Sequence, residues 1–326
     1  MPAGRTTNMT RREVFRAGTM VAGGVALARL YPEWLAAYAQ QPAAAPVDPL
    51  TATRQGMGAT PIERQQLAPN LALLMGPGGN VVILSGPEGK VVVDSFVQPA
   101  FAKLREHTAR SGTGPIKLLI DTHWHFDHAD NNENFRKAGA EILAHENTKK
   151  RLSEAHDLLG MHFPPAPADA LPTLTFADTQ KVDVNGETLE LAHFAPAHTD
   201  TDISVLYTKA NVLHMGDVFF NGAYPFIDAS TGGSVNGMIA GADKALKMVN
   251  AQTRIVPGHG PLGNRAALTT YRDMLVTVRD RVAKLKSAGR TMEQVVAAKP
   301  SAAFDATWGK GFMMPDVFVG IVYSTL

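Results

Sequence analysis

Three histidines and one aspartate fall within six residues directly after an apolar run, and this cluster limits the possible folds more than any other feature. Residues 117–121 (KLLID) have the composition of a buried strand, and residues 122–130 read THWHFDHAD. At a strand end, alternate side chains such as His123 and His125 point one way, while a following helical turn points Asp127 and His128 another way. Two such ligand pairs suit two metal ions roughly 3.5–4 Å apart. The pattern therefore predicts a sheet that ends at a binuclear site.

Three further candidate ligands stand alone, each behind a predicted strand. They are His198 in APAHTDTD, Asp217 in LHMGDVFF and His259 in IVPGHGP. Singly, each is typical of a turn, a helix cap or a loop. Their shared position after strands, beside Gly or Pro turns, favours convergence on one edge of a sheet.

The chain of 326 residues contains no cysteine. This excludes disulfides, thiolate zinc sites, cysteine nucleophiles and iron–sulfur clusters. Any metal must be held by His, Asp or Glu, a donor set that suits Zn, Fe or Mn. The formal charge of +1, from 31 basic and 30 acidic residues, gives no footprint for nucleic acid. We therefore expect a small-molecule substrate and no nucleic-acid partner, and an oligomer is left open.

The first 39 residues have the composition of an export signal. Arg11 and Arg12 precede a weakly apolar stretch over 17–30, and Ala37-Tyr38-Ala39 matches a small-residue cleavage site. The pattern resembles a twin-arginine (Tat) signal; an uncleaved anchor or an amphipathic helix is the alternative. We expect a periplasmic or secreted protein without a membrane contact after cleavage, and a Pro- and Ala-rich linker over residues 40–66.

The remaining chain, residues 67–326, alternates strand-like and helical segments, which predicts a single α/β domain with sheets inside and helices outside. Its C-terminal part contains a long amphipathic helix over 264–288. The apolar segment 307–318 (TWGKGFMMPDVF) would line either a substrate mouth or an oligomer interface. Packing is the favoured interpretation.

The ordered motifs HxHxDH, AHTxxD, GD and PGHG over residues 68–265 resemble the metallo-β-lactamase superfamily. The resemblance implies an αββα sandwich with a site at one edge of two sheets. It also implies two metal ions, most simply Zn²⁺ with Fe or Mn possible, and Asp217 as the ligand shared by both. Asp94 and Thr199 would orient ligands, or act only as turn residues. The implied ligands of the first ion are His123, His125 and His198, and those of the second are Asp127, His128 and His259.

The resemblance implies a hydrolase in which a hydroxide between two cations attacks an ester, lactone, thioester or amide carbonyl. Asp127 would be the catalytic residue that orients the nucleophile and passes on its proton. Tyr224 and Asn221 are candidates for a substrate contact, with packing as the alternative. An Asp at position 217 is typical of the lactonase-, glyoxalase-II- and thioesterase-like members, whereas true β-lactamases generally carry Cys or Ser there.

Four alternatives remain open at this point. The export signal favours a periplasmic β-lactamase, since antibiotics are met there. The ligand set also suits a phosphodiesterase, which the neutral charge disfavours, and a di-iron redox protein, which would need an electron-donor module. A non-catalytic binding protein would be expected to have lost ligands.

Overall fold

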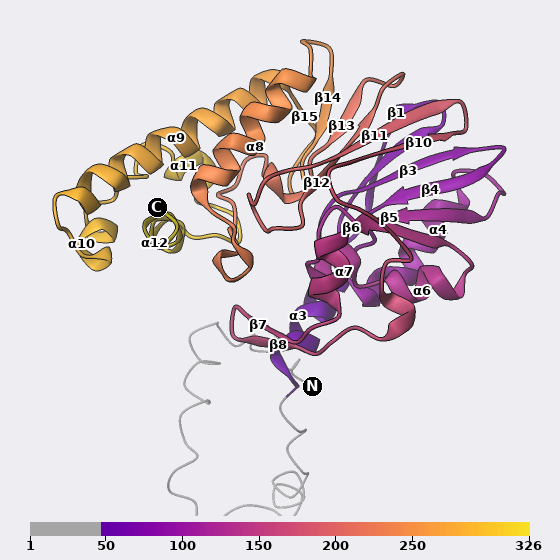
Figure 1. Ribbon diagram of the computed structural model, residues 1–326, viewed down its shortest axis with the longest axis horizontal. Coiled ribbons are helices and arrows are strands. Elements are labelled where there is room, and N and C mark those ends of the chain that lie inside the picture. The colour runs from indigo at the N-terminus through magenta and orange to yellow at the C-terminus, as the bar shows by residue number, and fades with distance from the viewer. Residues whose placement is uncertain (1–46) are drawn as a thin grey trace, which may run out of the picture. The chain divides into compact units, whose positions relative to one another are not determined.

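The computed structural model describes residues 47–326, so the predicted signal over residues 1–39 lies outside the described part of the chain (Figure 1). Two mixed sheets stand face to face within this part. The first contains seven strands, in the spatial order β1 (Glu63–Ala68), β2 (Leu71–Met75), β3 (Val81–Gly86), β4 (Gly89–Val93), β5 (Ile116–Ile120), β6 (Glu141–His145) and β9 (Leu174–Phe176). The strands from β1 to β4 pair antiparallel, and those from β4 to β9 pair parallel.

The second sheet contains six strands and is antiparallel except at one pair. Its order is β10 (Thr179–Val184), β11 (Glu187–His193), β12 (Ile203–Tyr207), β13 (Val212–His214), β14 (Arg254–Val256) and β15 (Gly263–Asn264), and β13 pairs parallel with β14. A separate hairpin joins β7 (His156–Leu158) to β8 (Met161–Phe163).

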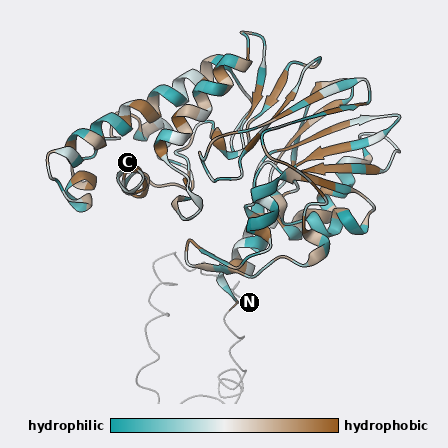
Figure 2. Ribbon diagram, in the orientation of Figure 1, coloured by the Kyte–Doolittle hydropathy of each residue, from teal (hydrophilic) through white to brown (hydrophobic). Residues whose placement is uncertain are grey.

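Helices cover the outer face of each sheet (Figure 1). The first sheet is covered by α4 (Phe101–Ala109) and α6 (Asn132–Lys137), with α7 (Glu146–Leu152) following β6; the second sheet is covered by α8 (Val235–Met248) and α9 (Arg265–Ser287). The space between the sheets is apolar, and residues such as Val82, Leu191 and Val205 are fully buried there. Figure 2 shows this apolar content along the strands and on the inward helix faces. The predicted αββα sandwich is confirmed.

The linker predicted over residues 40–66 is wrong from Pro49 onward. Residues Pro49–Gly58 form α3, and β1 begins at Glu63. Asp48 caps this helix by accepting a hydrogen bond from the Thr51 N–H at 2.9 Å, and proline suits the first helical position. Leu50 anchors the helix against the β7–β8 hairpin. The Pro- and Ala-rich composition concealed a capped helix.

The C-terminal segment consists of α10 (Met292–Ala297), α11 (Asp305–Trp308) and α12 (Pro315–Ser324), which pack against α9 and the loop around Tyr224. The Tyr224 ring stacks on Phe318 with centroids 4.4 Å apart, and its hydroxyl donates to Asp305 Oδ1 at 2.7 Å. Because Tyr224 is buried in this core, the prediction of a substrate contact is wrong for this residue, and its packing alternative is confirmed.

Within residues 47–326, no helix has both the length and the apolar composition needed to cross a bilayer.

Tyr224→Phe should lower the free energy of unfolding by about 1.5–3 kcal/mol, the usual value of a hydrogen bond to a charged group. Hydrolytic activity should not change, since Tyr224 faces the helical core. Tyr323→Phe is the matched control, because within residues 47–326 its exposed hydroxyl bonds only the Arg290 carbonyl, and a change within about 0.5 kcal/mol is expected. Urea denaturation measures both. A loss of activity without a loss of stability in Tyr224→Phe would contradict this account.

Candidate metal centre

The predicted ligands meet at one edge of the sandwich because each follows a strand that ends there. His123 and His125 lie in the loop after β5, and the short helix α5 (Phe126–Ala129) carries Asp127 and His128. His198 lies between β11 and β12, and His259 lies between β14 and β15. Asp217 occupies a 3-10 turn, Gly216–Val218, after β13. The structure brings all seven side chains together.

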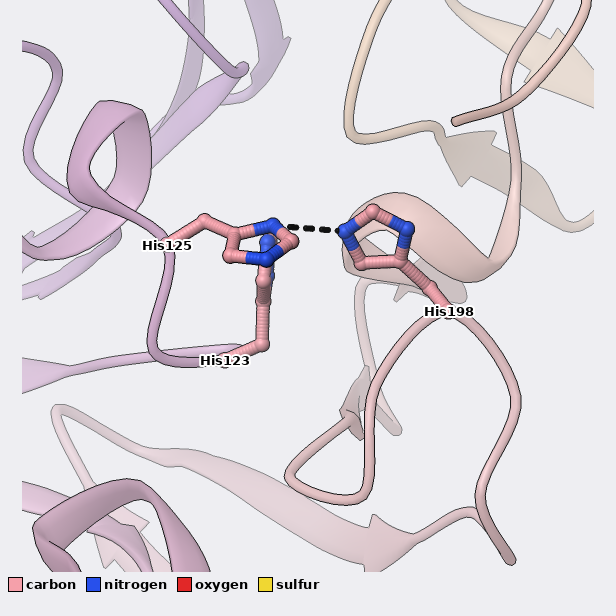
Figure 3. Close-up of side chains that lie close together, drawn as sticks. All are labelled: His123, His125 and His198. Atoms are coloured by element: carbon pink, nitrogen blue, oxygen red, sulfur yellow. Dashed lines mark hydrogen bonds between the residues drawn. The ribbon is translucent and has the colours of Figure 1, made fainter. Parts of the chain in front are cut away.

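His123, His125 and His198 form the first cluster (Figure 3). His125 Nδ1 and His198 Nε2 are 2.8 Å apart, and the His123 ring stands edge-on to both. All three residues are buried, and His123 Nε2 has no hydrogen-bond partner in the described part of the chain. A buried nitrogen without a partner is costly, and a cation bound by one nitrogen of each histidine, all within 4.8 Å of one another, would give His123 Nε2 a partner.

Asp127, His128 and His259 form the second cluster. His259 Nε2 lies 3.2 Å from Asp127 Oδ2 and 3.4 Å from His128 Nε2. The side chain of His259 is 29% exposed and that of Asp127 is 13% exposed, whereas His128 is fully buried. Solvent therefore reaches the centre from the side of the second cluster.

The carboxylate of Asp217 lies between the two clusters. Its Oδ1 is 3.1 Å from His128 Nε2, and its Oδ2 is 3.4 Å from both His198 Nε2 and His259 Nε2. The same Oδ2 is 4.0 Å from His123 Nε2. One carboxylate therefore contacts both groups of donors.

The burial of the histidines and the carboxylates beside them set the pKa values of this centre. Burial lowers the pKa of His198 to about 4 and that of His123 well below its usual range, so both are neutral nitrogen donors. Burial also disfavours charge on His259, but Asp217 and Asp127 outweigh it and raise the pKa to about 9. The His259 proton thus partly balances two buried carboxylates. A bound cation would replace it, since ligating imidazoles must be deprotonated.

Asp94 orients His128, as predicted. Its Oδ2 accepts from His128 Nδ1 at 2.7 Å, and its two oxygens also accept from the Thr122 N–H and hydroxyl, each at 2.8 Å. Asp94 adopts a φ of +62°, uncommon outside glycine, and these three bonds hold it there. Thr199 is different, because its hydroxyl bonds Asp202 and contacts no candidate ligand side chain. Its alternative role as a turn residue is the one observed.

Two further residues orient the first cluster and were missed by the sequence analysis. Asp228 Oδ2 lies 3.3 Å from His125 Nε2, and the Phe226 carbonyl accepts from His198 Nδ1 at 2.8 Å. Both lie in the irregular loop before α8, where no motif or periodicity marks them. Only the three-dimensional fold places them against the histidines.

Two glycines and one asparagine let the loops around the centre approach the ligand side chains closely. A Cβ on Gly79 would lie 2.0 Å from His128 Cε1, and one on Gly258 would lie 1.9 Å from Asp217 Oδ1. Asn80 Nδ2 donates to the carbonyls on either side of His259, those of Pro257 and Gly260, each at 2.9 Å.

Asn221, a candidate substrate contact, instead donates from Nδ2 to the Pro261 carbonyl at 2.8 Å. The structure therefore gives the amide of Asn221 a role in holding the His259 loop.

The family is shown by comparison with known proteins. A family model described as the metallo-beta-lactamase superfamily matches residues 75–289, more than half of the chain, and the chain belongs to this superfamily. The probable metallo-hydrolase YqgX of Bacillus subtilis is 27% identical over 165 residues, covering 49% of this chain and 75% of that protein. A hydroxyacylglutathione hydrolase of Nitrosococcus oceani is 26% identical over 203 residues, covering 61% of this chain and 66% of that protein. The predicted class, a hydrolase of this superfamily, is confirmed.

Solved structures share the fold at low identity. A metallo-beta-lactamase from Pontibacter korlensis superposes with a TM-score of 0.56 at 18% identity, covering 66% of this chain and 99% of that one. The stereoselective inverting sec-alkylsulfatase Pisa1 from Pseudomonas sp. superposes with a TM-score of 0.61 at 16% identity, covering 84% of this chain and 52% of that one. These similarities concern the fold alone.

Gly258→Ala should weaken metal binding about tenfold or more, because the added methyl group would displace the Asp217 carboxylate. Gly56→Ala is the matched control: no neighbouring atom lies within 4 Å of its Cβ position, and it should stabilise α3 by about 0.5–1 kcal/mol. Competition with a chromophoric chelator measures the affinity. Unchanged affinity in Gly258→Ala would show that the Asp217 position is not needed.

Asp94→Asn should lower metal affinity about 10–100-fold, because its single amide oxygen cannot accept from both the Thr122 N–H and His128 Nδ1, and the negative charge beside His128 is lost. Asparagine tolerates a positive φ, so the backbone should keep its conformation. Asp200→Asn is the control, since the Asp200 carboxylate pairs with Arg151 and contacts no candidate ligand. The same chelator competition, combined with thermal unfolding, separates a local effect from a loss of fold.

Proposed function

We propose that this protein is a binuclear zinc-dependent hydrolase that cleaves a carbonyl ester, lactone, thioester or amide of a small molecule. The observation that carries the proposal is the position of Asp217, whose two oxygens lie within 3.4 Å of histidines from both clusters. In this proposal Asp217 is the shared ligand. The ligands of the first ion are His123, His125 and His198, and those of the second are Asp127, His128 and His259.

The donors suit this assignment. All seven are imidazole nitrogens or carboxylate oxygens, and the first cluster offers three imidazoles, a donor set typical of catalytic zinc. The same donors accept Fe or Mn, so zinc is the metal we propose and the others are outcomes of the test. Two ligands of the first cluster are held in position by hydrogen-bonding partners, since Asp228 contacts His125 and the Phe226 carbonyl accepts from His198.

Two divalent cations at such a site supply a water that is acidic near neutral pH and a Lewis acid for the substrate carbonyl. The protein contributes the orientation and the route for the proton. Asp127 lies at the solvent-accessible side of the centre. Burial disfavours its charge, but His128 and His259 outweigh it and lower its pKa to about 2, so Asp127 is an anionic acceptor for a hydrogen bond from water. His259, beside it, is the other partly exposed residue of the second cluster.

Support for carbonyl substrates comes from the residue at position 217. The family resemblance associates Asp there with lactonase-, glyoxalase-II- and thioesterase-like members, and a hydroxyacylglutathione hydrolase is among the similar proteins. The Arg11-Arg12 motif and the 17–30 stretch support export to the periplasm as part of the proposal. A glutathione thioester is then a less suitable substrate than an ester or lactone.

Purified protein should contain two equivalents of zinc by elemental analysis and should hydrolyse aryl esters, γ-lactones or thioesters faster than the β-lactam nitrocefin or an alkyl sulfate. Asp127→Asn should lower kcat/KM about 10²–10⁴-fold, the usual effect of losing a general base. Asp183→Asn, on exposed β10, should leave activity unchanged. Faster turnover of nitrocefin would favour a β-lactamase. Two irons without hydrolysis would favour a redox protein, and absence of any metal would contradict the proposal.

A further inference from the structure

An apolar groove of about 870 Å³ lies beside the first cluster, between the β7–β8 hairpin and the C-terminal helices. The tip of the hairpin contributes Leu158 and Leu159, and α10 and α12 contribute Met292, Val317 and Ile321. Its volume is in the range of small-molecule sites. In Figure 1 these elements are seen around the same region of the molecule, with α10 and α12 on one side and the hairpin below.

The groove adjoins the candidate metal centre through two shared residues. Phe226 lines the groove, and its ring centroid is 5.9 Å from the rings of both His125 and His198. Asp228 also lines the groove, and its carboxylate contacts His125. Phe226 and Asp228 therefore lie between the groove and the first cluster, and a molecule in the groove would have one end against these two residues.

The apolar surface and the charged residues of the groove indicate which kind of ligand it can bind. Its exposed surface is almost entirely apolar, and the described residues that line it include no Lys, Arg or His. The only charged groups are carboxylates: Asp228 at the inner end, and Glu293 and Asp316, which are exposed. A substrate with a phosphate or carboxylate tail would be repelled and would leave its charge without a partner. An uncharged hydrocarbon chain fits.

Several groove residues are more exposed than their type normally is. Leu159 is 50% exposed, Val317 51% and Met292 39%, and all three face the same groove. An apolar surface that is contiguous and concave indicates a binding site rather than chance exposure. The adjacent metal centre argues for a substrate as the occupant, since the groove ends at Phe226 and Asp228, the two residues that orient His198 and His125.

We propose that this groove binds the alkyl or acyl chain of the substrate, so that the enzyme prefers uncharged esters or lactones with a medium-length hydrocarbon tail. This inference rests on the proposed function, because it places the carbonyl at the metal centre. Leu158, Leu159, Met292, Val317 and Ile321 would cover the chain, and Phe226 would lie between the chain and the reacting group. The groove is then the specificity-determining part of the molecule.

The test is a series of p-nitrophenyl esters from acetate to decanoate with the metal-loaded protein. Each methylene that enters the groove should raise kcat/KM by about fourfold, as expected from burial of a CH₂ group. Val317→Asp should lower the decanoate-to-acetate ratio of kcat/KM at least tenfold. Leu174→Asp is the matched control, because Leu174 is 48% exposed on the edge strand β9, does not line the groove, and should leave the ratio unchanged.

A second readout separates this inference from the proposed function. Binding of 1-decanol, measured by calorimetry, should be saturable in the wild type and Leu174→Asp and about tenfold weaker in Val317→Asp, whether or not any ester is cleaved. Decanol binding without hydrolysis of any ester or lactone would contradict the proposed function and leave the groove assignment supported. Hydrolysis that does not depend on chain length, or equal decanol binding by Val317→Asp and Leu174→Asp, would overturn the groove assignment. A wild-type dimer dissociated by Val317→Asp, with no change in chain-length preference, would identify the groove as a contact between two copies and would also overturn it.

Discussion

The edge of this sandwich depends on one electrostatic constraint: the Asp217 carboxylate is almost completely buried and yet must remain charged. Burial of a carboxylate is costly unless partners compensate it. In the structure the compensation comes from histidines of both clusters, and His259 and His128 hold the Asp217 pKa well below its usual range against the effect of burial. The close loop contacts follow from this constraint. Gly258 leaves room for the carboxylate, and Asn80 ties the His259 loop to the first sheet.

Two apolar cores stabilise the elements that carry this polar edge. The layer between the sheets fixes the ends of β5 and β13, from which the first histidines and Asp217 extend, while the core under α8 and α9 fixes the loop that carries Asp228. Rigid elements therefore set the ligand positions, and strain is confined to positions such as Asp94, where three hydrogen bonds hold a left-handed backbone. A site built in this way is organised before a metal binds, so binding need not order the chain.

The sequence predicted those features whose geometry is set by residues that are neighbours in the chain. His123, His125, Asp127 and His128 are adjacent in the chain, and a strand end followed by a helical turn determines where they point. The two-sheet fold followed from the order of the motifs. Asp228 was missed because its partner, His125, is 103 residues away and its own loop has no periodicity. The helix α3 was missed for a different reason, since its apolar content is small and its stability comes from the Asp48 cap and the packing of Leu50 and Met57 on neighbouring elements.

Different parts of the chain carry the metal-ligand donors and the groove. The candidate metal ligands lie at strand ends of the sandwich, which is the part of the fold that the superfamily shares. The hairpin β7–β8 and the helices α10 and α12 lie outside the two sheets, and they supply most of the groove wall. Phe226 and Asp228 connect the two parts, because each contacts a histidine of the first cluster and also lines the groove. Changes in the hairpin and the C-terminal helices can therefore alter which substrate is held without moving a ligand, whereas a change at Phe226 or Asp228 alters both.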